Sequence, residues 1–132
     1  MKTLLIALSL LVLSGCAVVD RFIIAPFDPN EYSLVNTLRS SSILVKPNCS
    51  NISRNEVNHL YNIALTLKNY SEYLPKNDQT IKPVNTTYQM VSELKSRYEK
   101  ENKLNKTYCE LKMQSIIDAS ELTQKAIGKR PR

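Results

Sequence analysis

The feature that most constrains this fold is the scarcity of glycine. Residues 16–132 contain a single glycine, Gly128. Glycine supplies the positive φ angles of phosphate-binding loops and of most tight β-hairpin turns, so both are disfavoured here. The long glycine-free stretches are rich in Leu, Lys, Glu, Ser and Asn. Such stretches favour helices, so the sequence predicts an all-α fold.

The N-terminus has the pattern of an export signal. Lys2 precedes an apolar run of ten residues, Leu4–Leu13, and the small residues Ser14 and Gly15 follow it. A run of about ten residues is too short to cross a bilayer, which needs about twenty. A short basic region, an apolar segment and small residues before a cleavage site are typical of secretory signals. Residues 1–15 are therefore predicted to be a signal peptide.

The residue after this segment is a cysteine, and Leu13-Ser14-Gly15-Cys16 resembles the lipobox of bacterial lipoproteins. That resemblance implies that Cys16 carries acyl chains, palmitate among them, and becomes the first mature residue. It also implies sorting to the periplasmic face of the outer membrane, because Ala17 stands where an Asp commonly causes inner-membrane retention. The alternative is an ordinary signal peptide with an accidental cysteine.

Two further cysteines, Cys49 and Cys109, remain in the mature chain. The periplasm is kept oxidising, so the simplest prediction is an intramolecular disulfide between them. Intermolecular bridges and free thiols are the alternatives. The segment between the lipobox and the first helix, residues 16–28, is predicted to be a lipid-anchored tether. Its Phe22, Ile24 and Phe27 are expected to pack on the helical body, with the bilayer interface as the alternative.

Capping patterns divide residues 29–128 into helices. Asp28, Pro29 and Glu31 predict a capping-box-like start for a first helix over 29–46. Ser53 and Glu56 form an S-x-x-E box that starts a second helix, which Pro75 ends.

Helix boundaries are less clearly indicated by the sequence in the second half of the domain. Residues 76–80 read as a polar loop, with a third helix beginning near Pro83. A capping box at Thr107 either starts a fourth helix or lies where the third continues through a polar patch. Gly128 ends the last helix. The last helix is expected to bury a face of apolar and small residues, Leu111, Ser115, Ala119, Leu122 and Ala126, widened by Met113, Ile116 and Ile127.

Two arrangements of these helices fit the sequence. Cys49 and Cys109 lie almost equally far from the centre of the loop between Leu74 and Pro83, as an antiparallel hairpin requires. Two continuous arms of about 45 residues would each be roughly 67 Å long. The alternative is a compact bundle of three or four helices, in which the first helix folds back on the second. Either would be stapled by the disulfide.

The sequence offers no catalytic motif, so a catalytic site, a metal site and a cofactor are not expected, nor is enzyme activity. His59 is the sole histidine, which leaves no pair for a dyad or a multi-histidine metal site. The carboxylates are scattered among lysines at helical spacing. Four tyrosines at core-like spacing are expected to pack amphipathically rather than to stack on bases: Tyr61, Tyr88, Tyr98 and Tyr108.

Positive charge is concentrated in residues 129–132, the basic tail. Removing the signal peptide leaves 17 Lys and Arg against 12 Asp and Glu, a formal charge of +5. Lys129, Arg130 and Arg132 are candidate contacts for anionic lipid, an acidic protein or a cell-wall polymer. The alternative is a solvated end that complements the last helix dipole. Nucleic acid is not an expected partner for an exported lipoprotein.

These features together predict a lipid-anchored helical protein that acts through protein–protein or envelope contacts. Its size, Cys16, cysteine pair and basic end resemble those of small phage lipoproteins, including the outer-membrane spanin subunits of host lysis systems. That resemblance implies a coiled-coil partner in the inner membrane, met by the basic end. The alternative role is an envelope-structural or superinfection-exclusion lipoprotein that blocks a receptor.

Overall fold

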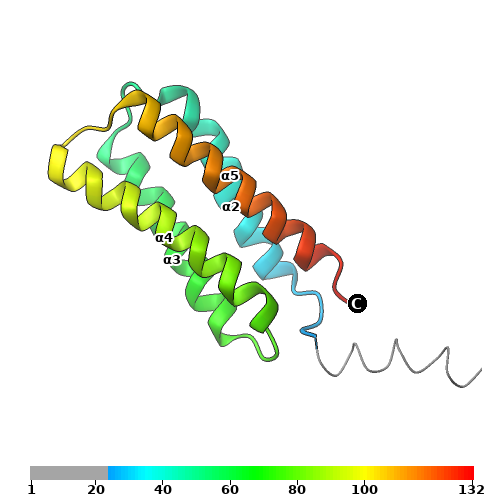
Figure 1. The fold of residues 1–132 in the computed structure, drawn as a ribbon. Helices are drawn as coiled ribbons and strands as arrows, with labels where there is room; N and C mark the ends of the chain where they lie inside the picture. The colour runs from blue at the N-terminus through cyan, green and yellow to red at the C-terminus, as the bar shows by residue number, and fades with distance from the viewer. Residues whose placement is uncertain (1–23) are drawn as a thin grey trace, which may run out of the picture.

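The computed structural model describes residues 24–132, which form helices joined by short connections (Figure 1). The all-α prediction is therefore confirmed for this part of the chain. None of the helices described there is both long and apolar enough to cross a bilayer. The elements in chain order are α2 (Pro29–Val45), the short 3₁₀ helix η1 (Lys46–Asn48), α3 (Arg54–Tyr73), α4 (Asp78–Glu101) and α5 (Lys106–Gly128).

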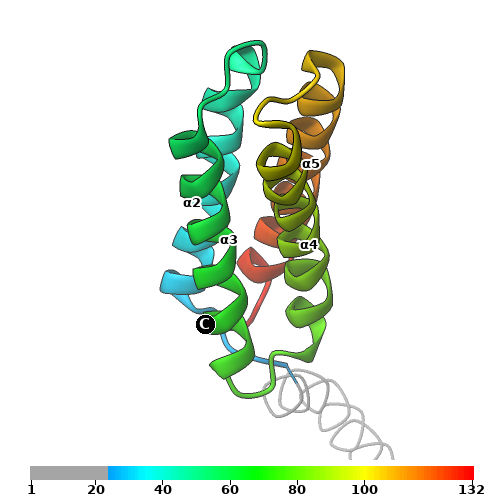
Figure 2. The same cartoon turned by 90° about the vertical axis from the view of Figure 1, so that its left-hand side faces the viewer.

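The four α-helices form an antiparallel bundle. Helix α2 packs against α3 and α5, and α4 packs against the same two helices from the opposite corner. Figure 1 shows α2 beside α5 and α3 beside α4, and Figure 2 shows α2 beside α3 and α4 beside α5. The compact bundle is thus the arrangement adopted, and the extended two-arm hairpin is wrong, because α2 folds back on α3.

The predicted pairing of the first and last helices is nevertheless confirmed. Gln124 donates to Asn36 over 3.1 Å, Arg39 lies 3.6 Å from Glu121, and Lys46 donates to Gln114 over 2.5 Å. Residues later in the first helical segment contact residues earlier in α5, as expected for an antiparallel pair.

Two of the helix starts agree closely with the sequence patterns. The Asp28 side chain accepts the Glu31 N–H at 2.8 Å and caps α2. Ser53 and Glu56 form the complete reciprocal capping box of α3. Helix α5 begins slightly earlier than its predicted start at Thr107, because the Asn105 side chain accepts the Tyr108 N–H and caps it.

Helix α4 corrects the sequence prediction most. It begins at Asp78, inside the segment expected to be a loop, and contains Pro83. The carbonyl of Asn77 accepts the N–H groups of Thr80 and Ile81, which establishes the first turn before the proline is reached. Pro83 has no backbone N–H and so removes one helical hydrogen bond. Because it lies near the start of α4, the helix continues past it.

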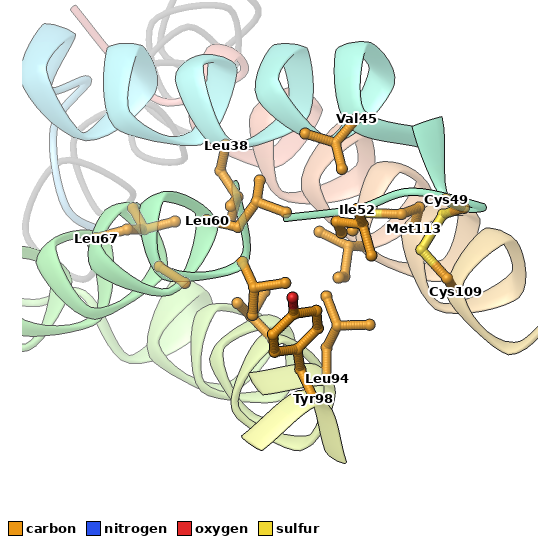
Figure 3. Close-up of a cluster of buried hydrophobic side chains, with 14 of the residues drawn as sticks. Leu38, Val45, Cys49, Ile52, Leu60, Leu67, Leu94, Tyr98, Cys109 and Met113 are labelled. Atoms are coloured by element: carbon orange, nitrogen blue, oxygen red, sulfur yellow. A yellow bond between two sulfur atoms is a disulfide. The ribbon is translucent and has the colours of Figure 1, made fainter. Parts of the chain in front are cut away.

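Each helix buries one stripe of residues at alternating spacings of three and four. This spacing is the heptad pattern of antiparallel bundles and coiled coils. Figure 3 shows part of the resulting apolar core. The stripes are Val35, Leu38, Ser42 and Val45 in α2; Val57, Leu60, Ala64 and Leu67 in α3; Val84, Thr87, Val91, Leu94 and Tyr98 in α4; and Cys109, Met113, Ile116, Ser120, Thr123 and Ile127 in α5.

The α5 stripe differs from the predicted one. Leu111 and Leu122, placed in the core by the sequence analysis, are 65% and 68% exposed. The residues expected only to widen that face, including Met113 and Ile116, are fully buried instead. Helix α5 therefore carries two apolar faces, and the bundle buries one of them.

The predicted cysteine pair is confirmed. A disulfide links Cys49 to Cys109, whose Cα atoms are 5.6 Å apart, and both residues are fully buried. It joins the connection after η1 to the first turn of α5 (Figure 3). The bond lies at the end of the bundle opposite residue 24, which we call the far end.

Candidate functional site: the tether end

The other end of the bundle gathers three separate parts of the chain, and we call it the tether end. Residues 24–28 enter there, next to the turn between α3 and α4 and to the tail after α5 (Figure 2). The Ala25 N–H donates to the carbonyl of Lys76 at 3.1 Å, and the Phe27 N–H donates to that of Pro131 at 2.9 Å. The entering segment is thus held between the turn and the tail.

Side-chain packing reinforces these backbone bonds. The Phe27 ring lies 5.7 Å from that of Tyr32, and the Arg132 guanidinium lies 5.1 Å from the Phe27 ring centre. Ala25 is buried, whereas Ile24 and Phe27 are half-buried. Packing on the body was the favoured prediction, and Phe27 does pack against the core. Phe22 lies outside the described residues.

Beneath this surface lies a buried group of polar side chains centred on Glu31. The Glu31 carboxylate is completely buried and accepts hydrogen bonds from Ser71 Oγ and Asn77 Nδ2, each at 2.7 Å. Its other oxygen accepts from Arg130 Nη1 at 2.6 Å. The Arg130 side chain is only 5% exposed. The result is a buried ion pair with additional hydrogen bonds on the carboxylate.

Four more hydrogen bonds complete the group. Thr80 Oγ1 donates to Asn77 Oδ1 at 2.7 Å, and Asn77 Nδ2 also donates to the carbonyl of Ser71 at 2.8 Å. Arg130 Nη2 donates to both Asn77 Oδ1 and Thr80 Oγ1. We call these five residues the polar layer: Glu31, Ser71, Asn77, Thr80 and Arg130. The layer joins α2, α3, α4 and the tail that follows α5.

The polar layer corrects two sequence predictions. Glu31 was expected to close a capping box on Asp28, but its carboxylate points into the bundle. Arg130 was expected to offer its charge to an external anion, yet that charge is neutralised internally by Glu31. The physical reason is the same in both cases. A buried charge is tolerated when an opposite charge and hydrogen-bond partners surround it.

A signal for this layer was present in the sequence. Its members continue the heptad stripes past the apolar core: Glu31 four residues before Val35, Ser71 four after Leu67, Thr80 four before Val84, and Arg130 three after Ile127. Polar residues at core positions of a stripe predict either an end of the core or a buried network. Their mutual contacts were not predictable, because they join residues up to 99 positions apart.

The surface over the polar layer combines prolines with basic groups. A shallow hollow of about 380 Å³ is lined by Pro26, Pro75, Lys76, Pro131 and Arg132. Lys129 is also exposed, so two of the three predicted basic contacts, Lys129 and Arg132, lie at the surface.

The remaining candidates lie along the sides of the bundle. His59 is exposed. The Tyr61 and Tyr88 hydroxyls are 3.1 Å apart, and this hydrogen bond raises the pKa of Tyr61 and lowers the pKa of Tyr88. Lys95 and Lys68 lie 5.0 Å and 5.7 Å from the Tyr61 and Tyr88 ring centres, respectively.

Two further tyrosines also pair with arginines. Arg54 lies 5.5 Å from the Tyr98 ring centre, and Arg97 lies 4.2 Å from that of Tyr108. All four tyrosines of the sequence prediction therefore pack where two helices meet. Their contacts are cation–π pairs with neighbouring side chains, which stabilise helix packing.

Among residues 24–132, no three His, Cys, Asp or Glu side chains converge in a way that could hold a metal ion. Cys16 and Ala17, the predicted lipidation and sorting residues, lie outside residues 24–132, as does the predicted signal peptide.

Comparisons with known proteins add no relatives. No protein-family model, no curated protein and no solved structure matches this chain.

Proposed function

We propose that this protein is a lipid-anchored lipoprotein on the periplasmic face of the outer membrane, and that its bundle acts by binding another envelope component. The lipobox resemblance at Cys16 supports the anchor. The observation that carries the proposal is the fastening of Ala25 and Phe27 to the bundle. Cys16 precedes Ile24 by eight residues, so an anchor there holds the tether end within about 28 Å of its lipid.

Binding rather than catalysis is supported by large apolar side chains that α2 and α5 expose. Ile43 and Leu44 of α2 are 43% and 78% exposed, and Leu111 and Leu122 of α5 are exposed to a similar degree. Helices α2 and α5 pack side by side. Leu111 and Leu122 lie about three turns apart on the same side of α5. Large exposed apolar side chains that gather on one face are typical of protein-binding surfaces.

Of the two contact roles, the geometry favours an envelope-structural or receptor-blocking lipoprotein over a lysis protein. A membrane-bridging role needs a partner-binding end directed away from the anchored membrane. The basic tail instead lies beside the tether, and its Arg130 is engaged by Glu31. The longest helix among residues 24–132, α4, has 24 residues and is about 36 Å long, so the bundle acts close to its anchor.

The test is expression of the full chain in a bacterial host, with phage adsorption, envelope permeability and lysis measured in parallel. Wild-type protein should change adsorption or permeability without lysis. Leu44→Glu/Leu122→Glu should abolish the effect, because each change replaces a large exposed apolar side chain with a charge. Asn62→Glu/Thr66→Glu, on the exposed face of α3, is the matched control and should retain it.

Three results would contradict this role. They are lysis that depends on a co-expressed inner-membrane coiled-coil protein, full activity of the Leu44/Leu122 variant, and no effect of the wild-type chain. The first would restore the lysis role.

Sorting is tested separately. Ala17→Asp should move the protein towards inner-membrane fractions, if the host follows the common sorting rule. Wild-type protein found entirely in the inner membrane would overturn the outer-membrane assignment.

A further inference from the structure

We propose that the tether end is a membrane-binding surface that contacts the headgroups of anionic phospholipids. The surface consists of Tyr73 at the end of α3, Lys76 and the prolines of the hollow, together with Lys129 and Arg132. This inference rests on the proposed lipid anchor and adds to it a specific orientation. The bundle would stand on the bilayer with its polar-layer end facing the headgroups.

The apolar part of this surface has the composition of a membrane interface. Tyr73 is 85% exposed, more than any other large apolar or aromatic side chain among residues 24–132. Tyrosine is enriched where protein meets the headgroup region, because its ring is apolar and its hydroxyl polar. Pro26 and Pro75 are exposed at the same end of the bundle and line the hollow.

The basic part of the surface complements anionic lipid. Lys76, Lys129 and Arg132 are all exposed there. Asp78 is an exposed acid nearby, whereas the Asp28 carboxylate accepts hydrogen bonds from the Tyr70 hydroxyl and the Glu31 N–H. Clustered basic residues next to a membrane anchor are attracted to anionic headgroups.

The far end has a different composition. Its connections, residues 49–53 and 102–105, expose Ser50, Asn51 and Asn102, and bury their aliphatic side chains Ile52 and Leu104. Lys103 and Lys106 also lie there, so positive charge alone does not distinguish the ends. What distinguishes the tether end is the exposed ring of Tyr73, the proline-lined hollow and the entry of the tether.

The polar layer makes this surface a preformed one. Arg130 connects the tail to Asn77, the residue after Lys76, and to Thr80 in the first turn of α4. The backbone bonds of Ala25 and Phe27 tie the tether to the same two segments. The segments that carry the three basic groups are therefore held at the tether end by the same contacts that fix the direction of the tether.

The experiment uses full-length lipidated protein purified from membranes and reconstituted into vesicles of phosphatidylethanolamine and phosphatidylglycerol. A fluorophore on Tyr73→Cys reports the tether end, and one on Asn51→Cys reports the far end. A small fraction of lipids carries a headgroup nitroxide quencher. The Tyr73 position should be quenched several-fold more strongly than the Asn51 position. Equal quenching at both positions would overturn the proposed orientation.

Charge reversal tests the headgroup contact. In the Tyr73→Cys background, Lys76→Glu/Lys129→Glu/Arg132→Glu should reduce quenching to the far-end level. Unchanged quenching in that triple variant would overturn the role of the basic groups. The matched far-end variant, Lys103→Glu/Lys106→Glu, should leave quenching as it was, and a loss there would also contradict the proposal. Circular dichroism verifies that each variant remains helical.

Failure of the anchor is distinguishable from failure of the surface. Protein without acyl chains on Cys16 would not float with the vesicles and would show the unmodified mass, which overturns the anchor and this inference together. Protein that floats and carries acyl chains, but shows equal quenching at the two ends, overturns the membrane-binding surface alone.

Discussion

The two ends of the bundle are closed by different chemistry at equivalent positions of the same pattern. At the tether end the α2 stripe finishes in Glu31 and the α5 stripe in Arg130, which form a buried ion pair. At the far end the same two stripes finish in Cys49 and Cys109, which form a disulfide. A heptad position at the end of a core can thus be filled by an internal polar network or by a covalent bond.

The disulfide and the polar layer differ in the number of chain segments that each connects. The disulfide joins two segments and stabilises the fold mainly by restricting the unfolded chain. The polar layer joins α2, α3, α4 and the tail, and it depends on complete hydrogen bonding in the folded state. The end that organises the tether is therefore the more vulnerable to a single substitution.

The largest expected effect comes from breaking the polar layer. Arg130→Met should lower the free energy of unfolding by about 3–5 kcal/mol, because it leaves the Glu31 carboxylate buried without its charge partner. Urea denaturation followed by circular dichroism measures the loss. Lys129→Met, an exposed neighbour, is the control and should change stability by about 0.5 kcal/mol or less.

A double substitution sharpens the interpretation. Glu31→Met/Arg130→Met removes both charges and should recover most of the stability lost in Arg130→Met, because a hydrophobic pair of similar volume often replaces a buried ion pair without net cost. If the double variant is no more stable than the single one, an uncompensated carboxylate is not the cause of the loss.

The far end should respond somewhat less. Cys109→Ala should lower the free energy of unfolding by about 2–5 kcal/mol, the usual cost of losing a native disulfide. The closed loop spans 60 positions, for which the chain-entropy model gives about 4 kcal/mol. Non-reducing gels and peptide mapping of the wild type should show one intramolecular bond. Disulfide-linked dimers through Cys49 or Cys109 would contradict this arrangement.

The smallest effect concerns the cap of α3, also at the far end. Ser53→Ala should cost about 1 kcal/mol. The Ser53 backbone N–H, its hydroxyl and the Asn48 amide donate to Glu56 and lower the pKa of that carboxyl from its ordinary 4.5. A lowered pKa contributes stability above pH 4.5 that is lost as the pH falls through the folded-state value.

Comparison with Glu56→Gln isolates this contribution. The wild type should be more stable than Glu56→Gln near pH 7, and thermal unfolding should show the gap closing as the pH falls to about 3, well below the ordinary carboxyl value. A gap that stays constant over this range would contradict the assigned role of the charged carboxylate.

Local patterns predicted much of the fold. The Ser53–Glu56 box set the start of α3 correctly, and the two cysteines identified the disulfide and the antiparallel pairing of α2 with α5. These succeeded because capping is decided within one turn, and because a cysteine pair constrains distant positions directly. The choice between a hairpin and a bundle stayed open, since neither local signal fixes whether α2 folds back on α3.

The errors arose where partners are distant. Helix α5 has apolar residues on two faces, and sequence spacing alone did not show that Met113 rather than Leu111 meets the other helices. Glu31 matches a local capping pattern, but its carboxylate instead accepts hydrogen bonds from Ser71, Asn77 and Arg130, which lie far along the chain. The site was thus missed because its chemistry exists only after the four helices are assembled.

Everything proposed about function depends on the lipid at the tether end, and one measurement tests it most directly. Intact-mass and N-terminal peptide mass spectrometry should be performed on the protein extracted from bacterial membranes. We predict a mature chain that begins at Cys16, carries acyl chains on that residue and lacks residues 1–15. Cys16→Ser should instead accumulate as unmodified precursor. A membrane-extracted chain with an unmodified Cys16, or undiminished palmitate labelling of Cys16→Ser, would contradict the account.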